Sequence, residues 1–191
     1  MADSFADHQI LFFENPRAHF ENPWTYGVLY LIRRDILTCL GWDLGKNALT
    51  DHRALWPAAM ALLAGVDLLA KFYVGSDDLG AVGDRFRLFV EKFFRINAGD
   101  EELIYQLRNA LLHSFGLFAK SRKAEFRFGL SNGSPILVTR YPNDQYLVDL
   151  SALHTEFDFA VEAYRKALLG SETLQVNFEK MFPNYGSVRI V

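Results

Sequence analysis

Apolar residues recur at intervals of three and four along most of the chain, which is the spacing of one face of a helix. Asn22-Pro23 is a good helix start, because proline is favoured at the first helical position. Glycines at 41, 75 and 170 and Pro183 mark helix ends. The pattern predicts helices over residues 24–40, 53–73, 82–94, 100–118, 151–169 and 171–182, with Asp100 as the cap of the fourth.

Between residues 124 and 149, apolar and polar residues tend to alternate, which is the pattern of a strand. Three strand-like segments are separated by the turn sequences Ser131-Asn132-Gly133-Ser134 and Pro142-Asn143-Asp144. These segments are Ala124–Leu130, Pro135–Tyr141 and Gln145–Asp149. They predict a small three-stranded antiparallel insertion. The end of the chain, Val188 to Val191, is a further segment that could add to a sheet edge or to a partner.

The expected fold is mainly α, a four-helix up-and-down bundle with extra short helices and the β insertion after its third core helix. A chain of 191 residues that is 50% hydrophobic buries one sizeable core, and 17 Phe and 8 Tyr make it aromatic. We therefore expect one domain. Its parts are an N-terminal arm (1–22), core helices (24–119), the β insertion (123–149), C-terminal helices (150–182) and a tail (183–191).

The amino-acid composition bears on the compartment and the solubility of the protein. One cysteine, Cys39, excludes an internal disulfide and favours the reducing cytoplasm, and its apolar neighbours predict an inert thiol. No basic leader with an apolar run opens the sequence. The most apolar segment, Ala54 to Val66, is shorter than the roughly 20 residues of a membrane span. We expect a soluble protein without a membrane partner, and a net charge of −3 argues against general binding of polyanions.

The predicted helix over residues 100–118 has an apolar face and, opposite it, a stripe of polar residues that we call the polar seam. Glu102, Gln106, Asn109 and His113 fall on one stripe, at spacings of four, three and four, and Arg108 flanks it. The opposite arc is apolar and typical of a face packed on a core: Leu103, Ile104, Leu107, Ala110, Leu111 and Phe115. The seam is either an ordinary solvated face or a functional group of a cation, an amide and an imidazole.

Other charged residues also have two interpretations. Basic residues lie after this helix (Lys120, Arg122, Lys123 and Arg127) and before it (Arg85, Arg87, Lys92 and Arg95). Such clusters form solvated loops and helix faces or bind phosphate. Asp67 interrupts the apolar helix at 53–73, and because a lone buried carboxylate is costly, we expect it to be hydrogen-bonded or paired.

Arg108, Asn109 and His113 resemble the motif of the HEPN superfamily (higher eukaryote and prokaryote nucleotide-binding domains). In that family, a helical bundle carries an Arg, then four to six residues, then a His on its third core helix, often with a polar residue directly after the Arg. The segment from Ala61 to Leu69 is similar to the family's second core helix. The resemblance covers roughly residues 24 to 169, of which only the motif is specific, and the β insertion departs from the minimal bundle.

The resemblance implies a metal-independent endoribonuclease that cleaves RNA through its own 2′-OH at a cleft between two copies in a homodimer. His113 suits proton transfer, and Arg108 suits binding of phosphate charge. Asn109, one turn before His113, would orient the imidazole or bond to phosphate. Substrate would also contact Gln106, Glu102, Lys120, Arg122 and Lys123. A symmetric dimer would supply the second histidine that acid and base chemistry commonly needs.

No cofactor or metal is implied. Domains of this kind serve in toxin–antitoxin systems, phage defence and RNA processing, so an antitoxin or a regulatory protein is a further expected class of partner. Two alternatives stay open: a non-catalytic module that binds nucleotide, RNA or protein, and a structural dimerisation domain. His154, Glu156 and Asp158 form a weak candidate metal site, because their spacing does not place all three on one helical face.

Overall fold

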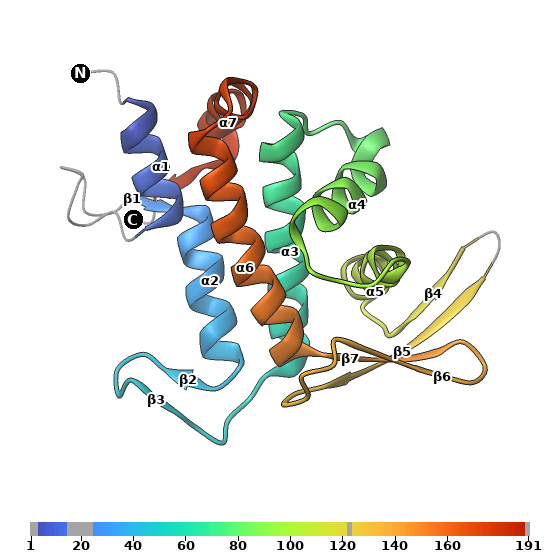
Figure 1. Cartoon of the computed structure of the whole chain (residues 1–191). Helices are drawn as coiled ribbons and strands as arrows, with labels where there is room; N and C mark the ends of the chain where they lie inside the picture. The colour runs from blue at the N-terminus through green and yellow to red at the C-terminus, as the bar shows by residue number, and fades with distance from the viewer. Residues whose placement is uncertain (1–3, 15–24, 122–123, 190–191) are drawn as a thin grey trace.

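The other helices pack around α3 (Leu55–Val74) in the computed structural model, which describes residues 4–14, 25–121 and 124–189 (Figure 1). The remaining helices in this part of the chain are α1 (Phe5–Phe13), α2 (Val28–Cys39), α4 (Val82–Phe93), α5 (Asp100–Ser114), α6 (Leu150–Leu169) and α7 (Glu172–Tyr185), with a 3-10 turn η2 (Leu79–Ala81) before α4. The strands are β1 (Thr25–Gly27), β2 (Trp42–Asp43), β3 (Ala48–Leu49), β4 (Phe118–Lys120), β5 (Glu125–Ser131), β6 (Val138–Tyr141), β7 (Gln145–Asp149) and β8 (Ser187–Arg189).

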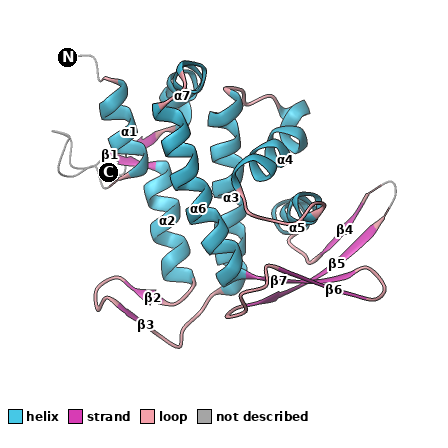
Figure 2. Cartoon of the chain, in the orientation of Figure 1, coloured by secondary structure: helices cyan, strands magenta, loops and turns pink. Residues whose placement is uncertain are grey.

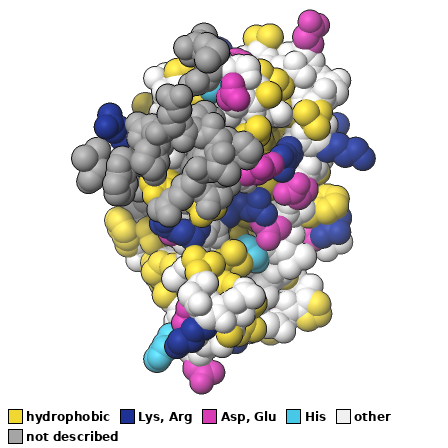
Figure 3. Space-filling view, turned by 90° about the vertical axis from the view of Figure 1, so that its left-hand side faces the viewer, with side chains coloured by type: hydrophobic (Ala, Val, Ile, Leu, Met, Phe, Trp, Pro, Cys, Tyr) yellow, Lys and Arg dark blue, Asp and Glu magenta, His cyan; other side chains and the backbone are white. Residues whose placement is uncertain are grey.

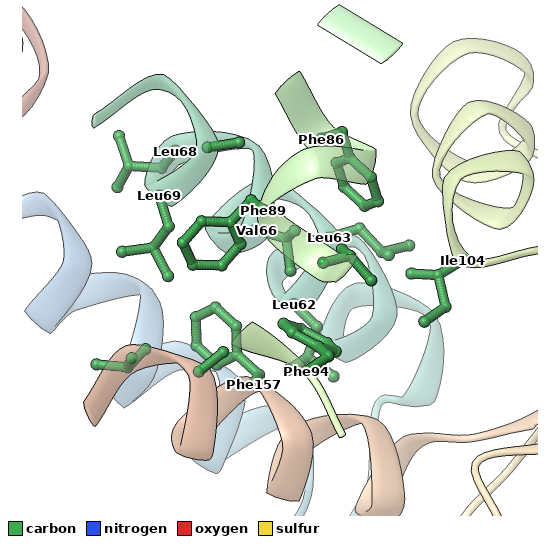
Figure 4. Packing of buried hydrophobic residues seen from close by; sticks show 14 of the residues in the cluster. Leu62, Leu63, Val66, Leu68, Leu69, Phe86, Phe89, Phe94, Ile104 and Phe157 are labelled. Atoms are coloured by element: carbon green, nitrogen blue, oxygen red, sulfur yellow. The ribbon is translucent and has the colours of Figure 1, made fainter. Parts of the chain in front are cut away.

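The near-continuous apolar sequence of α3 makes it central, because each of its faces meets another helix. It contacts α2, α4, α5, α6 and α7. In Figure 4 its residues Leu62, Leu63 and Val66 lie among Phe86, Phe89 and Phe157 from α4 and α6. Of the helices in the described segments, only α3 is long and apolar enough to cross a membrane, and 56% of its apolar window is buried inside the protein. That burial is typical of a core helix.

Helix α3 ends as predicted: Gly75 adopts φ +68, the left-handed conformation that glycine enters without steric cost. The start of α2, by contrast, differs from the prediction. Residues 25–27 are not helical but form β1, which pairs antiparallel with β8. The first amide of α2, on Val28, donates to the carbonyl of Gly186 at 3.0 Å, so a distant segment satisfies the helix start. Residues 22–24 lie outside the described part of the chain.

The β insertion differs from the predicted three-stranded antiparallel sheet. It has four strands in the order β4-β5-β7-β6, and β5 pairs with β7 in parallel. Asp149, at the end of β7, explains the arrangement. Its carboxylate accepts from the Ser131 hydroxyl at 3.0 Å and from the Ser134 amide at 2.9 Å, and so holds the turn after β5 around the end of β7. The following strand, β6, is therefore placed on the outer side of β7.

Asp149 also caps α6, accepting from the amides of Ser151 and Ala152 at 3.0 and 3.1 Å. Burial raises the pKa of this carboxyl, but the backbone amides of Ser134 and Ala152 and the Ser131 hydroxyl outweigh burial and hold the pKa below its ordinary value. One carboxylate thus joins the sheet to the start of a core helix.

Helix α5 is shorter than predicted. It ends at Ser114 rather than near 118, because Phe115 takes a left-handed conformation (φ +46) and the chain turns into β4. Phe115 is 72% exposed, so its expected place in the core was wrong. Asp100 is not the cap: Gly99 precedes the helix, and the buried Asp100 pairs with Arg140 at 2.5 Å instead.

Helix α7 begins one residue later than predicted, because Ser171 is its cap and the Ser171 hydroxyl accepts from the Leu174 amide. It continues past Pro183 to Tyr185, so the predicted tail from residue 183 starts too early. A proline loses a single helical hydrogen bond to the preceding turn, and the final turn of a helix tolerates that loss.

The mainly α class is confirmed, with the small sheets at the periphery (Figure 2). Helices α2, α3 and α6 run side by side, whereas α5 is seen nearly end-on in the same view and lies between α3 and the β4–β7 sheet. The four-helix up-and-down order stays a prediction.

Candidate functional site

Arg108 lies on α5 facing α3, where it forms an ion pair with Asp67. Its Nε and Nη2 atoms both donate to Asp67 Oδ2, at 2.8 and 2.5 Å. The two side chains are only 11% and 14% exposed. The sequence expectation that Asp67 is paired is thus confirmed. The other carboxylate oxygen, Oδ1, is buried and has no hydrogen-bond partner among the described residues.

The third guanidinium nitrogen joins Arg108 to the rest of the motif. Arg108 Nη1 lies 2.5 Å from His113 Nε2 and 3.1 Å from Asn109 Oδ1. Because a guanidinium only donates hydrogen bonds, this contact requires Nε2 of His113 to act as the acceptor. Residues five apart lie about 140° from each other around a helix, so this contact depends on the length of the arginine side chain rather than on the helix backbone.

The two ends of the motif differ in exposure. Arg108 is buried at 9% exposure, whereas His113 is exposed in the last turn of α5. His113 lies at the rim of an open hollow of about 370 Å³ between α5 and β4. The hollow is lined by Gln106, Asn109, Ala110, His113, Ser114, Phe118, Ala119 and Lys120. The structure therefore brings His113 and Asn109 together with Gln106 and Lys120.

Glu102 lies one turn before Gln106 on α5, further from His113, and belongs to a different group of contacts. It accepts from Arg87 Nε at 2.6 Å and from Gln106 Nε2 at 2.7 Å. Gln106 is nearly buried, at 7% exposure, and so connects the acidic start of the seam to the hollow. Burial lowers the pKa of Arg87, but the hydrogen bond and charge of Glu102 outweigh burial and raise it. Glu102 thus neutralises a cation and lies outside the hollow.

Strand β4, whose outer face continues onto β5, forms the side of the hollow opposite α5. Strand alternation places Phe118 and Lys120 on that face and buries Ala119 between them. The partners across the ladder are Arg127 and Glu125. Lys120 Nζ lies 3.1 Å from Glu125 Oε1, and this contact holds the pKa of the Glu125 carboxyl below its usual value. Arg122 and Lys123 lie outside the described residues.

The earlier basic cluster is largely engaged by protein acceptors. Arg85 donates to the carbonyl of Asp78, and Arg95 forms a pair with Glu156 at 2.9 Å. Lys and Arg side chains are likewise interleaved with Asp and Glu on the face seen in Figure 3. These contacts favour a structural role for Arg85, which is buried, and for Arg95, which is an exposed and paired cation.

The other candidate groups do not converge. His154 Nε2 lies 3.2 Å from Asp158 Oδ2, while Glu156 forms an ion pair with Arg95, so the three residues are divided between two separate contacts. Burial lowers the pKa of His154. Within residues 4–14, 25–121 and 124–189, no group of three or more His, Cys, Asp or Glu side chains is placed to hold a metal ion. Burial raises the pKa of the Cys39 thiol, in keeping with the inert thiol expected from its neighbours.

Comparisons with protein-family models, with curated proteins and with solved structures find no match to this chain.

Two features of the site escaped the sequence analysis. The pairing of Asp67 with Arg108 joins residues far apart in the sequence, and no local pattern identifies it. Phe118 was counted as the end of a helix, although the alternation of Phe118, Ala119 and Lys120 carries the period of a strand. Recognition of that alternation would have placed an aromatic ring and a lysine on one face beside the motif.

Proposed function

We propose that this chain is a metal-independent endoribonuclease of the HEPN type, acting as a homodimer in which two copies of the α5 motif face each other. One observation carries the proposal: a buried carboxylate, Asp67, holds a guanidinium against the exposed imidazole of His113 at the rim of an open hollow. A lone solvated histidine needs no such support. In catalytic sites, the side chains that react are typically held in position by hydrogen bonds from neighbouring residues.

The contact between Arg108 and His113 couples substrate binding to base activation in this proposal. A phosphate that enters the hollow competes with His113 as the acceptor for Arg108 Nη1, and an anionic oxygen is the stronger acceptor. Its arrival releases Nε2 of His113, which then has a free lone pair. Asp67 keeps the guanidinium in place throughout, because it binds Nε and Nη2 rather than Nη1.

The reaction is an attack of the 2′-oxygen on the adjacent phosphorus. Nε2 of His113 takes the proton of the 2′-hydroxyl, the bond from the 2′-oxygen to phosphorus forms, and the bond from phosphorus to the 5′-oxygen breaks. The partner subunit's His113, in its protonated form, gives a proton to the leaving 5′-oxygen. Arg108 stabilises the negative charge that builds on the phosphate. The products are a 2′,3′-cyclic phosphate and a 5′-hydroxyl.

The test is cleavage of a labelled single-stranded RNA in EDTA by the wild-type protein and by His113→Ala. We expect His113→Ala to lower the rate by about 100-fold or more, since that is the usual contribution of a general acid or base. His52→Ala is the matched control, because His52 is also exposed but lies outside the hollow. A substrate with 2′-deoxyribose at the cleavage position should resist cleavage.

Two further outcomes would decide against the proposal. RNA that stays intact after prolonged incubation with dimeric protein would exclude the nuclease. Mixing the wild type with an excess of His113→Ala should lower the activity of the wild-type subunits if each site uses both copies. Activity that depends only on the amount of wild-type protein would contradict the shared site.

A non-catalytic phosphate-binding module is the second candidate. It is favoured by the occupation of His113 Nε2 by Arg108, which leaves the imidazole only a donor to offer in this state. Such a module would show no cleavage to lose. Arg108→Ala and His113→Ala would both weaken RNA binding instead.

A further inference from the structure

Phe118 lines the same hollow as His113 and is exposed. The ring is 45% exposed, in contrast to Phe126 and Phe128 on the opposite face of the sheet, which are 7% and 8% exposed. A single exposed aromatic residue is common on protein surfaces. The position of Phe118 is distinguished by the other residues that line the hollow, which are His113, the amides Gln106 and Asn109, and Lys120.

The charges around this ring match a nucleotide. The guanidinium carbon of Arg127 lies 5.6 Å from the ring centroid, and Lys120 is two residues further along the same face of β4. Glu125 pairs with both cations, at 3.1 and 3.3 Å, so it orients them and leaves a single excess positive charge on this face. An aromatic ring beside backbone-binding cations is the arrangement by which proteins hold unpaired bases of a single strand.

We propose that Phe118 stacks on an unpaired nucleobase next to the cleaved phosphate, with Lys120 and Arg127 binding the neighbouring phosphates, so that single-stranded RNA is the substrate. The proposal rests on the proposed function, since it takes His113 as the reacting group. A base held in a duplex has both faces covered by its neighbours and cannot stack on Phe118. Phe118 thus determines specificity for strand form rather than for sequence, because every base offers a flat face.

The test measures binding in the His113→Ala background, so that the RNA is not consumed. The probes are a fluorescein-labelled single-stranded RNA of roughly 12 nucleotides, the same RNA annealed to its complement, and versions in which single positions lack a base. Phe118→Leu removes the aromatic face but keeps an apolar side chain, and Phe118→Trp restores a stacking surface. Phe159→Leu is the matched control, because Phe159 is 41% exposed and has Arg95 over its ring but lies outside the hollow.

Phe118→Leu should weaken single-strand binding by about 5- to 150-fold, which is the usual contribution of one stacked base. Phe118→Trp should restore binding, and Phe159→Leu should leave it unchanged. Removal of the stacked base from the RNA should cost the same factor in the parent protein and nothing in Phe118→Leu. Duplex RNA should bind weakly and without dependence on Phe118.

Single-strand affinity that is unchanged in Phe118→Leu would overturn the proposal, and so would a Phe118→Leu protein that loses its dimer in the absence of RNA. The latter result would make Phe118 an interface residue. The two proposals fail separately. Cleavage that requires His113 but ignores Phe118 leaves the nuclease standing without the stacking residue. Phe118-dependent binding without any cleavage by the wild type removes the nuclease and keeps the stacking site.

Discussion

Removal of Asp67 should destabilise the protein strongly, because it leaves the guanidinium of Arg108 buried without its carboxylate. Loss of one partner of a buried ion pair costs about 3–5 kcal/mol. Arg108 would keep two acceptors, Asn109 Oδ1 and His113 Nε2, and its side chain is 11% exposed. We therefore expect the low end of that range, about 3 kcal/mol, for Asp67→Ala.

Removal of both charges should cost less than removal of one. The double variant Asp67→Leu/Arg108→Met leaves no unpaired charge, and it also removes Asp67 Oδ1, a buried oxygen without a hydrogen-bond partner among the described residues. We expect it to be more stable than either single replacement by at least about 1 kcal/mol. This comparison separates the free-energy cost of a buried unpaired charge from the net contribution of the ion pair to stability.

Equilibrium unfolding in urea, followed by circular dichroism, measures these differences. With a urea m-value of about 2 kcal/mol/M, the Asp67→Ala midpoint should fall by roughly 1.5 M. Arg34→Ala is the control, since Arg34 pairs with Asp35 at 40% and 55% exposure, and its loss should cost less than about 0.5 kcal/mol. If Asp67→Ala resembles this control, water screens the pair and the anchoring of Arg108 assumed in the proposed site is wrong.

Substitutions at Gly27 and Asp149, with Gly170→Ala as a control, test the fold outside the site. Gly27→Ala should lower the melting temperature, at a cost of about 1–3 kcal/mol, because the new Cβ would lie 1.8 Å from the carbonyl oxygen of Leu11 and α1 would have to shift. Gly170→Ala, whose Cβ would meet no atom closer than 3.9 Å, should leave the melting temperature nearly unchanged. Asp149 has a folded pKa below its unfolded value, so its contribution to stability is complete above an unfolded pKa of about 3.9 and is lost as the pH falls through the folded pKa. Urea midpoints measured from pH 7 to pH 3 should therefore fall less steeply below pH 4 in Asp149→Asn, which starts from a lower stability at pH 7; an identical slope would refute the assignment.

Helices whose boundaries depend on local signals were predictable from the sequence. Gly75 ends α3 in the left-handed conformation, and Ser171 caps α7 with its own side chain. Boundaries that depend on distant partners were not. Residues 25–27 became a strand because β8 lies beside them, and β6 moved to the far side of β7 because Asp149 binds the turn at 131–134.

The candidate site was predictable to the same extent. The stripe of polar residues on one helix follows from helical geometry, and the hollow contains Gln106, Asn109 and His113 as that stripe requires. The burial of Arg108 depended on its ion pair with Asp67 on another helix, and a sequence gives the need for a partner without its identity. Phe118 joined the site because α5 ended early, at a residue whose backbone conformation was not evident from its type.

The pairing of β1 with β8 has a consequence for the order in which this protein can assemble during synthesis. The opening turn of α2 relies on the Gly186 carbonyl, which leaves the ribosome only after almost all the other described residues. Until then, the Val28 amide at the start of α2 lacks this protein acceptor. The start of α2 and strand β1 therefore reach their final hydrogen bonding only after β8 has been synthesised and has paired with β1.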